Sequence, residues 1–334
     1  MYVVEDTLDD LMLKVFQKLL KSTSSVKASR GSNKEILGVL LELKNPRARL
    51  SRTEMKGTIF SCLGEFLWYL SKSDDLEFIE YYLSRYGENS DDGKTVHGAY
   101  GPRLFNMEGQ INQIQNVIEL LSKKQTTRRA VVQLFDHKDI TKHYSDIPCT
   151  CTLQFFIRKN KLHMYVSMRS NDAYLGLPHD VFSFTMLQEI IARSLKVEIG
   201  RYKHSVGSLH LYSENVEQAQ RFIDEGYQST LSMPSMPAED PWPSIAKLLE
   251  QESIIRKNLT DEIHDDSDYW TDLSLLLKIF HLSKSSNPAN ISKIEELKDQ
   301  IKSGIYNIYI DKKQTTMKSK AAQQKLPFKE ATPA

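Results

Sequence analysis

The sequence predicts an α+β protein that ends in a helical extension. Short apolar runs such as residues 36–43 (ILGVLLEL) and 152–157 (TLQFFI) have the length of buried β-strands. Between such runs, apolar residues recur every three or four positions, which is the spacing of amphipathic helices. Beyond a proline-rich break only helical patterns remain. We therefore expect a helix-and-strand domain over residues 1–233, a helical extension over 234–311 and a disordered basic tail over 312–334.

Composition restricts the classes of function that the chain can have. Its 334 residues suffice for one large domain or two ordinary ones. A formal net charge of +1 argues against nucleic acid or an anionic membrane as a bulk partner. The three cysteines include a C-x-C pair too tight for an ordinary disulfide framework, which indicates a reducing compartment. The N-terminus carries acids where a signal peptide carries lysines, and no run approaches a spanning helix. We expect a cytoplasmic protein without a membrane segment.

The N-terminal third is predicted to alternate helices with a loop and a strand. Residues 7–21 have the periodicity of a helix, with Thr7 as its cap. In the polar loop that follows, Arg30 is either a solvated side chain or a phosphate ligand. A second helix over residues 52–71 is apolar around most of its circumference and contains Glu65. If this carboxylate is buried, it must be paired or have a raised pKa, as a proton-transfer group requires; alternatively it lies on one exposed polar stripe.

Two segments in the middle of the chain are candidates for functional loops. Residues 84–106 are rich in Gly, Asn and Asp and too long for a simple turn, and Tyr100 and Arg103 are their candidate functional residues. After a third amphipathic helix, Arg128 and Arg129 stand side by side where a strand begins. Adjacent strand residues point to opposite faces, so both arginines can bind one anion only from irregular backbone; otherwise one is a surface charge.

The stretch from Asp146 to Asp180 contains the strongest candidate nucleophile. Cys149 follows Pro148, whose ring fixes φ, and it precedes the apolar strand 152–157. A thiol at the mouth of a strand can be aimed at a ligand with little side-chain freedom.

The remaining part of the first domain is predicted to contain a long apolar helix over residues 181–196 and then a strand that leads into another helix. On that strand His210 and Tyr212 alternate and so share a face. Such a pair is more often a core or edge feature than a site.

Several short motifs occur together in one order along residues 8 to 225. They are Arg30 in an R-G loop, G-E-F-L-W at 64–68, the arginine pair 128–129, P-C at 148–149 followed by Gln154, R-S-N-D at 169–172, L-G-L-P at 175–178 and H-L-Y-S at 210–213. This set resembles the thymidylate synthase and deoxycytidylate hydroxymethylase family. The resemblance implies a mixed β-sheet packed with helices, and it leaves the C-terminal third uncovered.

The resemblance also implies covalent catalysis on a pyrimidine nucleoside monophosphate. These enzymes add a thiolate to C6 of the ring, which makes C5 a nucleophile toward a one-carbon unit. Cys149 matches the family nucleophile, Glu65 matches the carboxylate that manages protons at the ring, and Tyr100 matches a tyrosine of the same network. A neighbouring arginine, matched by Arg169, favours the thiolate and binds the substrate phosphate.

Further residues match substrate and co-substrate contacts of the family. Arg30, Arg169 and Ser170 match phosphate ligands, and His210 and Tyr212 match the residues that hold the 3′-hydroxyl. The expected substrate-binding set is Arg30, Arg128, Arg129, Arg169, Ser170, Asp180, Gln154, His210 and Tyr212. Arg128 and Arg129 match a pair that the family supplies from the second subunit, which implies a homodimer with shared sites. Asp172 and Gly176 match contacts to the co-substrate 5,10-methylenetetrahydrofolate, and no metal is implied.

One departure from the family pattern concerns the choice of base. After L-G-L-P-x, thymidylate synthases carry an asparagine that pairs with uracil, whereas this chain carries Asp180. An ionised carboxylate only accepts hydrogen bonds. It can accept from the 4-amino group of cytosine and, if it or N3 carries a proton, complete a second bond. Asp180 therefore favours cytosine, unless it turns away from the base and another residue sets the choice.

Other departures agree with a hydroxymethylase. The sequence Pro148-Cys149-Thr150 stands where synthases usually carry P-C-H. A helical extension takes the place of their short closing peptide. Since reduction to a methyl group needs water kept out, the replacement of the closing peptide favours hydration of the methylene. The leading hypothesis is a folate-dependent cytidylate or deoxycytidylate 5-hydroxymethylase. The alternatives are a thymidylate synthase that methylates dUMP and a catalytically silent nucleotide-binding homologue.

Overall fold

The computed structural model describes residues 1–28, 31–51, 58–226, 228–259, 267–285 and 287–324. The chain divides into two compact units, Met1–Pro243 and Ser244–Ala334. The division falls ten residues after the predicted boundary at 233, because the proline-rich segment is tied to the first unit. The Met233 amide donates to the Arg47 carbonyl over 2.8 Å, and the Trp242 indole donates to Ser194 Oγ over 3.0 Å.

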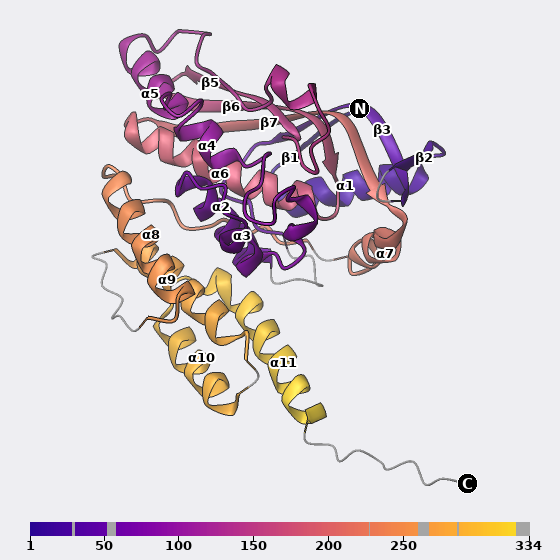
Figure 1. The fold of residues 1–334 in the computed structure, drawn as a ribbon, viewed down its shortest axis with the longest axis vertical. Helices are drawn as coiled ribbons and strands as arrows, with labels where there is room; N and C mark the ends of the chain where they lie inside the picture. The colour runs from indigo at the N-terminus through magenta and orange to yellow at the C-terminus, as the bar shows by residue number, and fades with distance from the viewer. Residues whose placement is uncertain (29–30, 52–57, 227, 260–266, 286, 325–334) are drawn as a thin grey trace. The chain divides into compact units, whose positions relative to one another are not determined.

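Among the described residues, the first unit contains all the strands, seven α-helices and three short 3-10 turns (Figure 1). The strands are β1 (Tyr2–Glu5), β2 (Ser25–Ala28), β3 (Gly31–Leu43), β4 (Val131–Gln133), β5 (Thr150–Arg158), β6 (Lys161–Asp172) and β7 (Glu198–Tyr212). The α-helices are α1 (Leu8–Lys21), α2 (Thr58–Leu70), α3 (Leu76–Tyr82), α4 (Tyr100–Phe105), α5 (Gln113–Lys123), α6 (Gly176–Ser194) and α7 (Val216–Asp224), and short 3-10 turns are η1 (Tyr86–Asn89), η2 (His137–Ile140) and η3 (Ser213–Asn215).

The strands form one mixed sheet in the order β1-β3-β7-β6-β5-β4, with β2 paired to β3. β6 runs parallel to β7 and antiparallel to β5, so the expected α+β fold with a mixed sheet is confirmed. The polar segment that contains Ser25 to Ala28 was predicted to be a loop, and this prediction is wrong: the segment pairs antiparallel with the start of β3. Because its side chains are mostly exposed, no apolar alternation marks this strand in the sequence.

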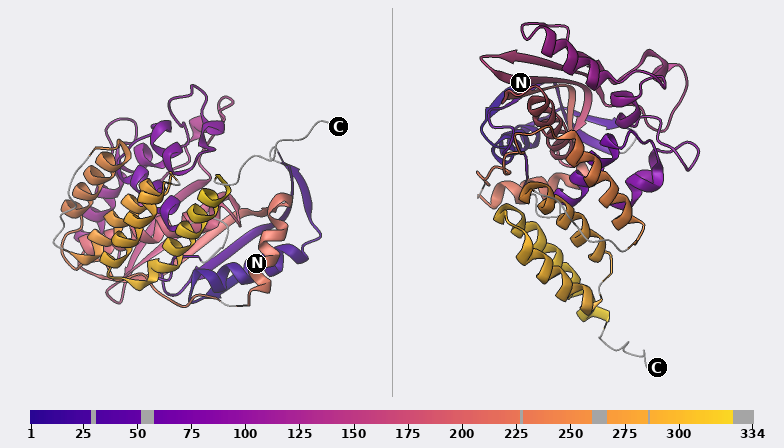
Figure 2. Two further views of the ribbon diagram at one scale, coloured as in Figure 1. Left: turned by 90° about the horizontal axis from the view of Figure 1, so that it is seen from below. Right: turned by 90° about the vertical axis from the view of Figure 1, so that its left-hand side faces the viewer.

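The core lies where helices cover one face of the sheet. α6 packs on β6 and β7, and α2 packs on α6, so that sheet and helices form successive layers (Figures 1 and 2). Along β5, Leu153, Phe155 and Ile157 are buried, whereas Gln154 and Phe156 on the opposite face are half-buried. This alternation shows that the second face of the sheet has less cover within the chain.

Helix boundaries follow local signals where the sequence supplies them. α1 begins after Thr7, whose Oγ1 accepts from the Asp10 amide over 3.1 Å, as the capping prediction required. Within the predicted irregular loop 84–106, residues Tyr100 to Phe105 instead form α4. The predicted helix 52–71 is described from Thr58 onward, and residues 52–57 lie outside the described residues.

The second unit is helical, as predicted. Its segments are α8 (Trp242–Arg256), which begins in the first unit, α9 (Asp268–Leu282), α10 (Pro288–Gln300), η4 (Gly304–Tyr306) and α11 (Asn307–Gln324). α9 packs on α10, and α10 packs on α11 (Figure 2). The prediction of a disordered tail from residue 312 is wrong for residues 312–324, which belong to α11, where Met317 is buried.

Candidate active site

Cys149 stands at the mouth of β5, held in place by an arginine from the neighbouring strand. Arg169 on β6 donates its backbone amide to the Cys149 carbonyl over 2.8 Å. Its guanidinium donates to the carbonyls of Pro148 and Ile147, each over 3.0 Å, and Nη2 lies 3.6 Å from Cys149 Sγ. The arginine thus fixes the backbone before the cysteine and sets a positive charge beside the sulfur, which favours a thiolate.

Tyr100 supports the first residue of β5. Its phenol oxygen accepts from the amide and the hydroxyl of Thr150, over 3.1 and 3.0 Å. Burial raises the pKa of Tyr100 well above its usual value, and the nearby carboxyl of Asp180 and thiol of Cys149 raise it further. The phenol therefore keeps its own proton, and it is a neutral donor next to the nucleophile.

Glu65 is buried, which excludes the exposed-stripe alternative. It lies one helical turn after Ser61 and one turn before Tyr69 on the same face of α2. Tyr69 Oη donates to Glu65 Oε1 over 2.9 Å, and His179 Nδ1 lies 2.5 Å from Glu65 Oε2. His179 Nε2 in turn lies 3.2 Å from Ser61 Oγ. Both oxygens of the carboxylate are therefore held by proton-bearing groups.

His179 carries the charge that balances Glu65. Burial lowers the pKa of His179, but the neighbouring Cys62 and Glu65 raise it by more. The pKa of His179 therefore lies well above its usual value. A buried carboxylate paired with an imidazolium avoids the cost of an isolated charge. The geometry places a proton donor and a proton acceptor in contact at the centre of the site.

The glycine that precedes Glu65 has a packing role. A Cβ built on Gly64 would lie 2.1 Å from the ring of Tyr82 on α3, so the close approach of these two helices requires a residue without a side chain. This contact explains the glycine of the G-E pair.

Asp180, in the first turns of α6, is half-buried and faces the same group of side chains. Its Oδ2 accepts from Asn171 Nδ2 over 3.1 Å. Burial raises the pKa of Asp180 to about 8, with a further contribution from the charge of Glu65, while His179 and the Asn171 hydrogen bond act in the opposite direction. At neutral pH the carboxyl therefore holds its proton, and it offers one donor and one acceptor.

The predicted phosphate and sugar ligands lie at the ends of the same central strands. Ser170 is half-buried on β6, directly opposite Ser208 of β7. On β7, His210 and Tyr212 share a face as predicted, with their rings in edge contact at 4.9 Å between centroids. Arg30 lies outside the described residues.

Arg128 and Arg129 precede β4, and both side chains are exposed. Gln154 Nε2 donates to the Arg128 carbonyl over 2.9 Å, so within this chain Gln154 positions the arginine pair. β4 is the last strand in the sheet order and pairs with β5. The arginine pair and Gln154 therefore lie at this edge of the sheet, whereas Glu65 lies on α2.

Asp172 and Gly176 form the turn that leads into α6. Asp172 Oδ1 accepts from the amides of Tyr174 and Leu175, over 2.8 and 3.1 Å. A Cβ on Gly176 would lie 3.0 Å from Asn171 Oδ1 and 3.6 Å from Asp180 Oδ2. The missing side chain of Gly176 therefore leaves room for the residues that hold Asp180.

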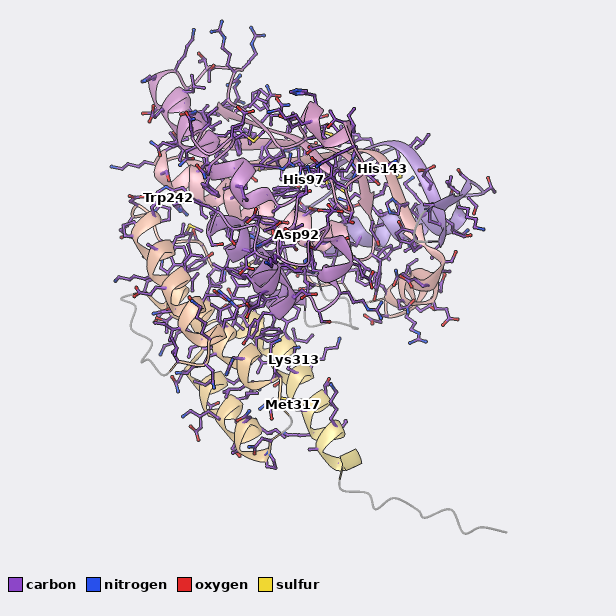
Figure 3. All side chains as sticks on the ribbon, in the orientation of Figure 1. Asp92, His97, His143, Trp242, Lys313 and Met317 are labelled. Atoms are coloured by element: carbon purple, nitrogen blue, oxygen red, sulfur yellow. The ribbon has the colours of Figure 1, made fainter. Side chains whose placement is uncertain are left out.

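Arg103, the other candidate of the 84–106 segment, has a structural role. Its guanidinium forms two bonds with Asp139, of 2.7 and 2.8 Å, and a third with the Leu134 carbonyl. His97, which Figure 3 labels, completes the cluster through a 2.8 Å contact with Asp139. This network ties α4 to the segment after β4 and leaves Arg103 no role at the cysteine.

Three residues beside the candidate catalytic groups were not identified from the sequence. His179 lies within the motif around L-G-L-P, but its partner Glu65 is 114 positions away. Asn171 and His204, which contact each other over 2.9 Å, are 33 positions apart. The local signal was that His179 directly precedes Asp180.

Within the described part of the chain, no group of three or more His, Cys, Asp or Glu side chains could hold a metal ion. None of the helices described is long and apolar enough to span a bilayer.

Known proteins provide an independent comparison. The sequence model of the thymidylate synthase family matches residues 38–247. A deoxyuridylate hydroxymethyltransferase of Delftia phage PhiW-14 is 33% identical over 213 residues, covering 59% of this chain and 58% of that protein. A deoxyuridylate hydroxymethyltransferase of Bacillus phage SP01 is 32% identical over 221 residues, covering 61% and 57%. A thymidylate synthase of Francisella philomiragia is 32% identical over 184 residues, covering 50% and 66%. The matched region spans less than two thirds of each of these relatives.

Proposed function

Because this chain belongs to the thymidylate synthase family, we propose that it transfers a one-carbon unit to C5 of cytidylate or deoxycytidylate and leaves a hydroxymethyl group there. The observation that carries the choice of base is the half-buried carboxyl of Asp180, which stands where the family's synthases carry an amide. With a pKa raised to about 8 by burial, it is protonated at neutral pH. The neutral acid can donate to N3 of cytosine and accept from the 4-amino group, so both polar groups of that edge are paired.

Covalent activation of the ring follows from the position of Cys149. Its thiolate, beside the Arg169 guanidinium at 3.6 Å, adds to C6, and the electron pair displaced from the C5–C6 bond makes C5 nucleophilic. C5 then forms a bond to the one-carbon unit of the folate. After C5 has lost its hydrogen as a proton, the C–N bond to the folate breaks, tetrahydrofolate leaves with a proton on its nitrogen, and an exocyclic methylene remains on C5. The Glu65–His179 pair lies within the same group of side chains, and it supplies an acceptor for the C5 proton.

The hydroxymethyl outcome needs one more step and no reductant. Water adds to the exocyclic methylene of the pyrimidine, the proton of that water passes to the Glu65–His179 pair, and the Cys149 sulfur leaves C6 with restoration of the C5–C6 double bond. The sum is redox-neutral. A methyl product would instead require a hydride. Two relatives are named hydroxymethyltransferases, which supports the first outcome.

The co-substrate of this reaction is 5,10-methylenetetrahydrofolate, which supplies the one-carbon unit. The turn before α6 suits a flat ring, because Asp172 is fixed there by two backbone amides and Gly176 presents no side chain. Asp172 would hold the pterin, as in the family. The thiol chemistry requires a reducing compartment, in keeping with a cytoplasmic enzyme.

A homodimer would complete the site. Arg128 and Arg129 are exposed in the single chain, and the sheet face that carries Phe156 and Tyr165 is only half-buried. If two such faces meet, the arginine pair of one subunit can reach the phosphate bound by Arg169 and Ser170 of the other.

The second candidate is a reaction on deoxyuridylate. It is favoured by the names of the two phage relatives and of the Francisella synthase. A neutral carboxyl could also pair with uracil, by accepting from N3–H and donating to O4. The two bases therefore differ in the order of donor and acceptor that they require from Asp180.

The test incubates the full chain with methylenetetrahydrofolate and, separately, dCMP, CMP or dUMP, and identifies the product by mass. We expect a 5-hydroxymethyl cytidine nucleotide. Thymidylate formed together with dihydrofolate would contradict the proposal and support a synthase. Nucleotide binding that survives Cys149→Ser, with no product from any pyrimidine, would identify a catalytically silent homologue.

A further inference from the structure

A chain of three buried polar residues stands behind Asp180, on the side opposite its helix. Asn171 on β6 is 3% exposed, and His204 and Tyr202 on β7 are 0% and 1% exposed. Asn171 Nδ2 lies 3.1 Å from Asp180 Oδ2 and 2.9 Å from His204 Nε2. His204 Nδ1 lies 2.7 Å from Tyr202 Oη. None of these three residues has a role in the reaction described above.

The protonation of this chain fixes the direction of its hydrogen bonds. Burial lowers the pKa of His204 to about 3, so the imidazole is neutral. Its Nε2 accepts from the Asn171 amide, and its Nδ1–H is then the donor toward Tyr202. One amide hydrogen of Asn171 is thereby used on His204, and the other remains for Asp180. The thioether of Met168, 3.1 Å from Nδ2, is a weak acceptor by comparison.

We propose that Asn171 is a specificity-determining positioning residue, which assigns different roles to the two oxygens of Asp180. Because Oδ2 already accepts from the amide, the acid proton is left to Oδ1. The carboxyl then presents its donor and its acceptor to a base in one order only. Cytosine and uracil need opposite orders, so a fixed order discriminates between them, whereas a carboxyl free to exchange its proton between oxygens would pair with either. This inference deepens the proposed function and rests on it for the choice of cytosine.

The space around Asn171 supports a role in positioning rather than in simple packing. Its Oδ1 is buried and has no hydrogen-bond partner among the described residues, which is a cost that an apolar side chain would avoid. The hydrogen bond to His204 orients the amide, and Gly176 leaves room for Oδ1, because a Cβ there would lie 3.0 Å from that oxygen.

The experiment compares base preference in the wild type, Asn171→Ala and Asn171→Ser, with Ser170→Ala as the matched control. Equilibrium dissociation constants for dCMP and dUMP are measured by calorimetry, and kcat/KM is measured for the same two nucleotides. Ser170 is the next residue along β6 and a predicted phosphate ligand, so its loss should weaken both nucleotides equally. We expect the preference ratio to fall about tenfold or more in both Asn171 variants and to stay unchanged in Ser170→Ala.

Equal weakening of both nucleotides by the Asn171 variants would overturn the inference. The two dissociation constants give this ratio even without turnover, and the serine variant gives it if the alanine variant does not fold. A wild type that prefers dUMP would refute the cytidylate proposal, but the role of Asn171 would stand if its replacement removed that preference.

Discussion

Raising the pH through 8 should switch off recognition of cytidylate, because Asp180 then loses the proton that pairs with N3. The groups that face this carboxyl are Glu65 on α2, His179 beside it on α6, and Asn171 and Asp172 on β6. Burial and the charges of Glu65 and Asp172 favour the neutral acid, whereas His179 and Asn171 favour the carboxylate. Their balance leaves the pKa of Asp180 at about 8.

The size of the effect follows from that value. At pH 7 about nine tenths of the free enzyme would hold the proton on Asp180, and at pH 9 only about one tenth would. Since kcat/KM reports ionisation of the free enzyme, it should fall about tenfold for each pH unit above 8. Because the protonated form of Asp180 is the one that binds cytidylate, kcat/KM is high below the pKa of Asp180 and falls above it.

The assay measures kcat/KM for dCMP from pH 6 to pH 10 in the wild type and in Asp180→Asn. The amide of the variant offers a donor and an acceptor but does not ionise. We expect an alkaline limb near pH 8 in the wild type and its absence in the variant. An identical limb in both proteins would refute the assignment, since another group would then be responsible.

Three further predictions rest on the same contacts. Between about pH 4 and pH 8 the folded protein retains the Asp180 proton that the unfolded chain has lost, so urea unfolding should show that stability falls about 1.4 kcal/mol per pH unit more steeply in the wild type than in Asp180→Asn; parallel curves would argue against a raised pKa. His179→Phe should destabilise the protein by about 3 kcal/mol in urea, because Glu65 loses its buried partner, and a double variant with Glu65→Leu should recover part of that loss; no recovery would mean that the two side chains are not coupled. Inactive Cys149→Ser and inactive Arg129→Ala proteins, unfolded and refolded together in equal amounts, should regain about a quarter of wild-type activity through mixed dimers with one intact site; no recovery would contradict shared sites.

Much of the fold could be predicted because its signals are local. Each of three signals is contained in a short stretch of sequence: the cap at Thr7, the apolar period of α1 and the apolar strand after Cys149. Where local signals are weak, the predictions failed. The side chains of β2 are mostly exposed, and residues 312–324 become helical although their sequence has little apolar periodicity.

The residues of the candidate site also divide into those with a local sequence signal and those without one. The motifs identified Cys149, Glu65 and Asp180, and the structure brings Asp180 and Glu65 within electrostatic reach of each other. The residues that set their protonation could not be predicted, because His179 and Asn171 reach their partners through the packing of α6 on α2 and the pairing of β6 with β7. A single sequence contains no record of such long-range contacts.

The central claim is that the Cys149 thiolate attacks a cytosine ring. Release of tritium to water from [5-³H]dCMP, in the presence of methylenetetrahydrofolate, measures that attack directly, because the C5 hydrogen leaves only after C6 has been activated. We predict release from dCMP by the wild type, with little from [5-³H]dUMP, and none from either nucleotide with Cys149→Ser. Release from dUMP alone, or release from dCMP that persists in Cys149→Ser, would contradict the account.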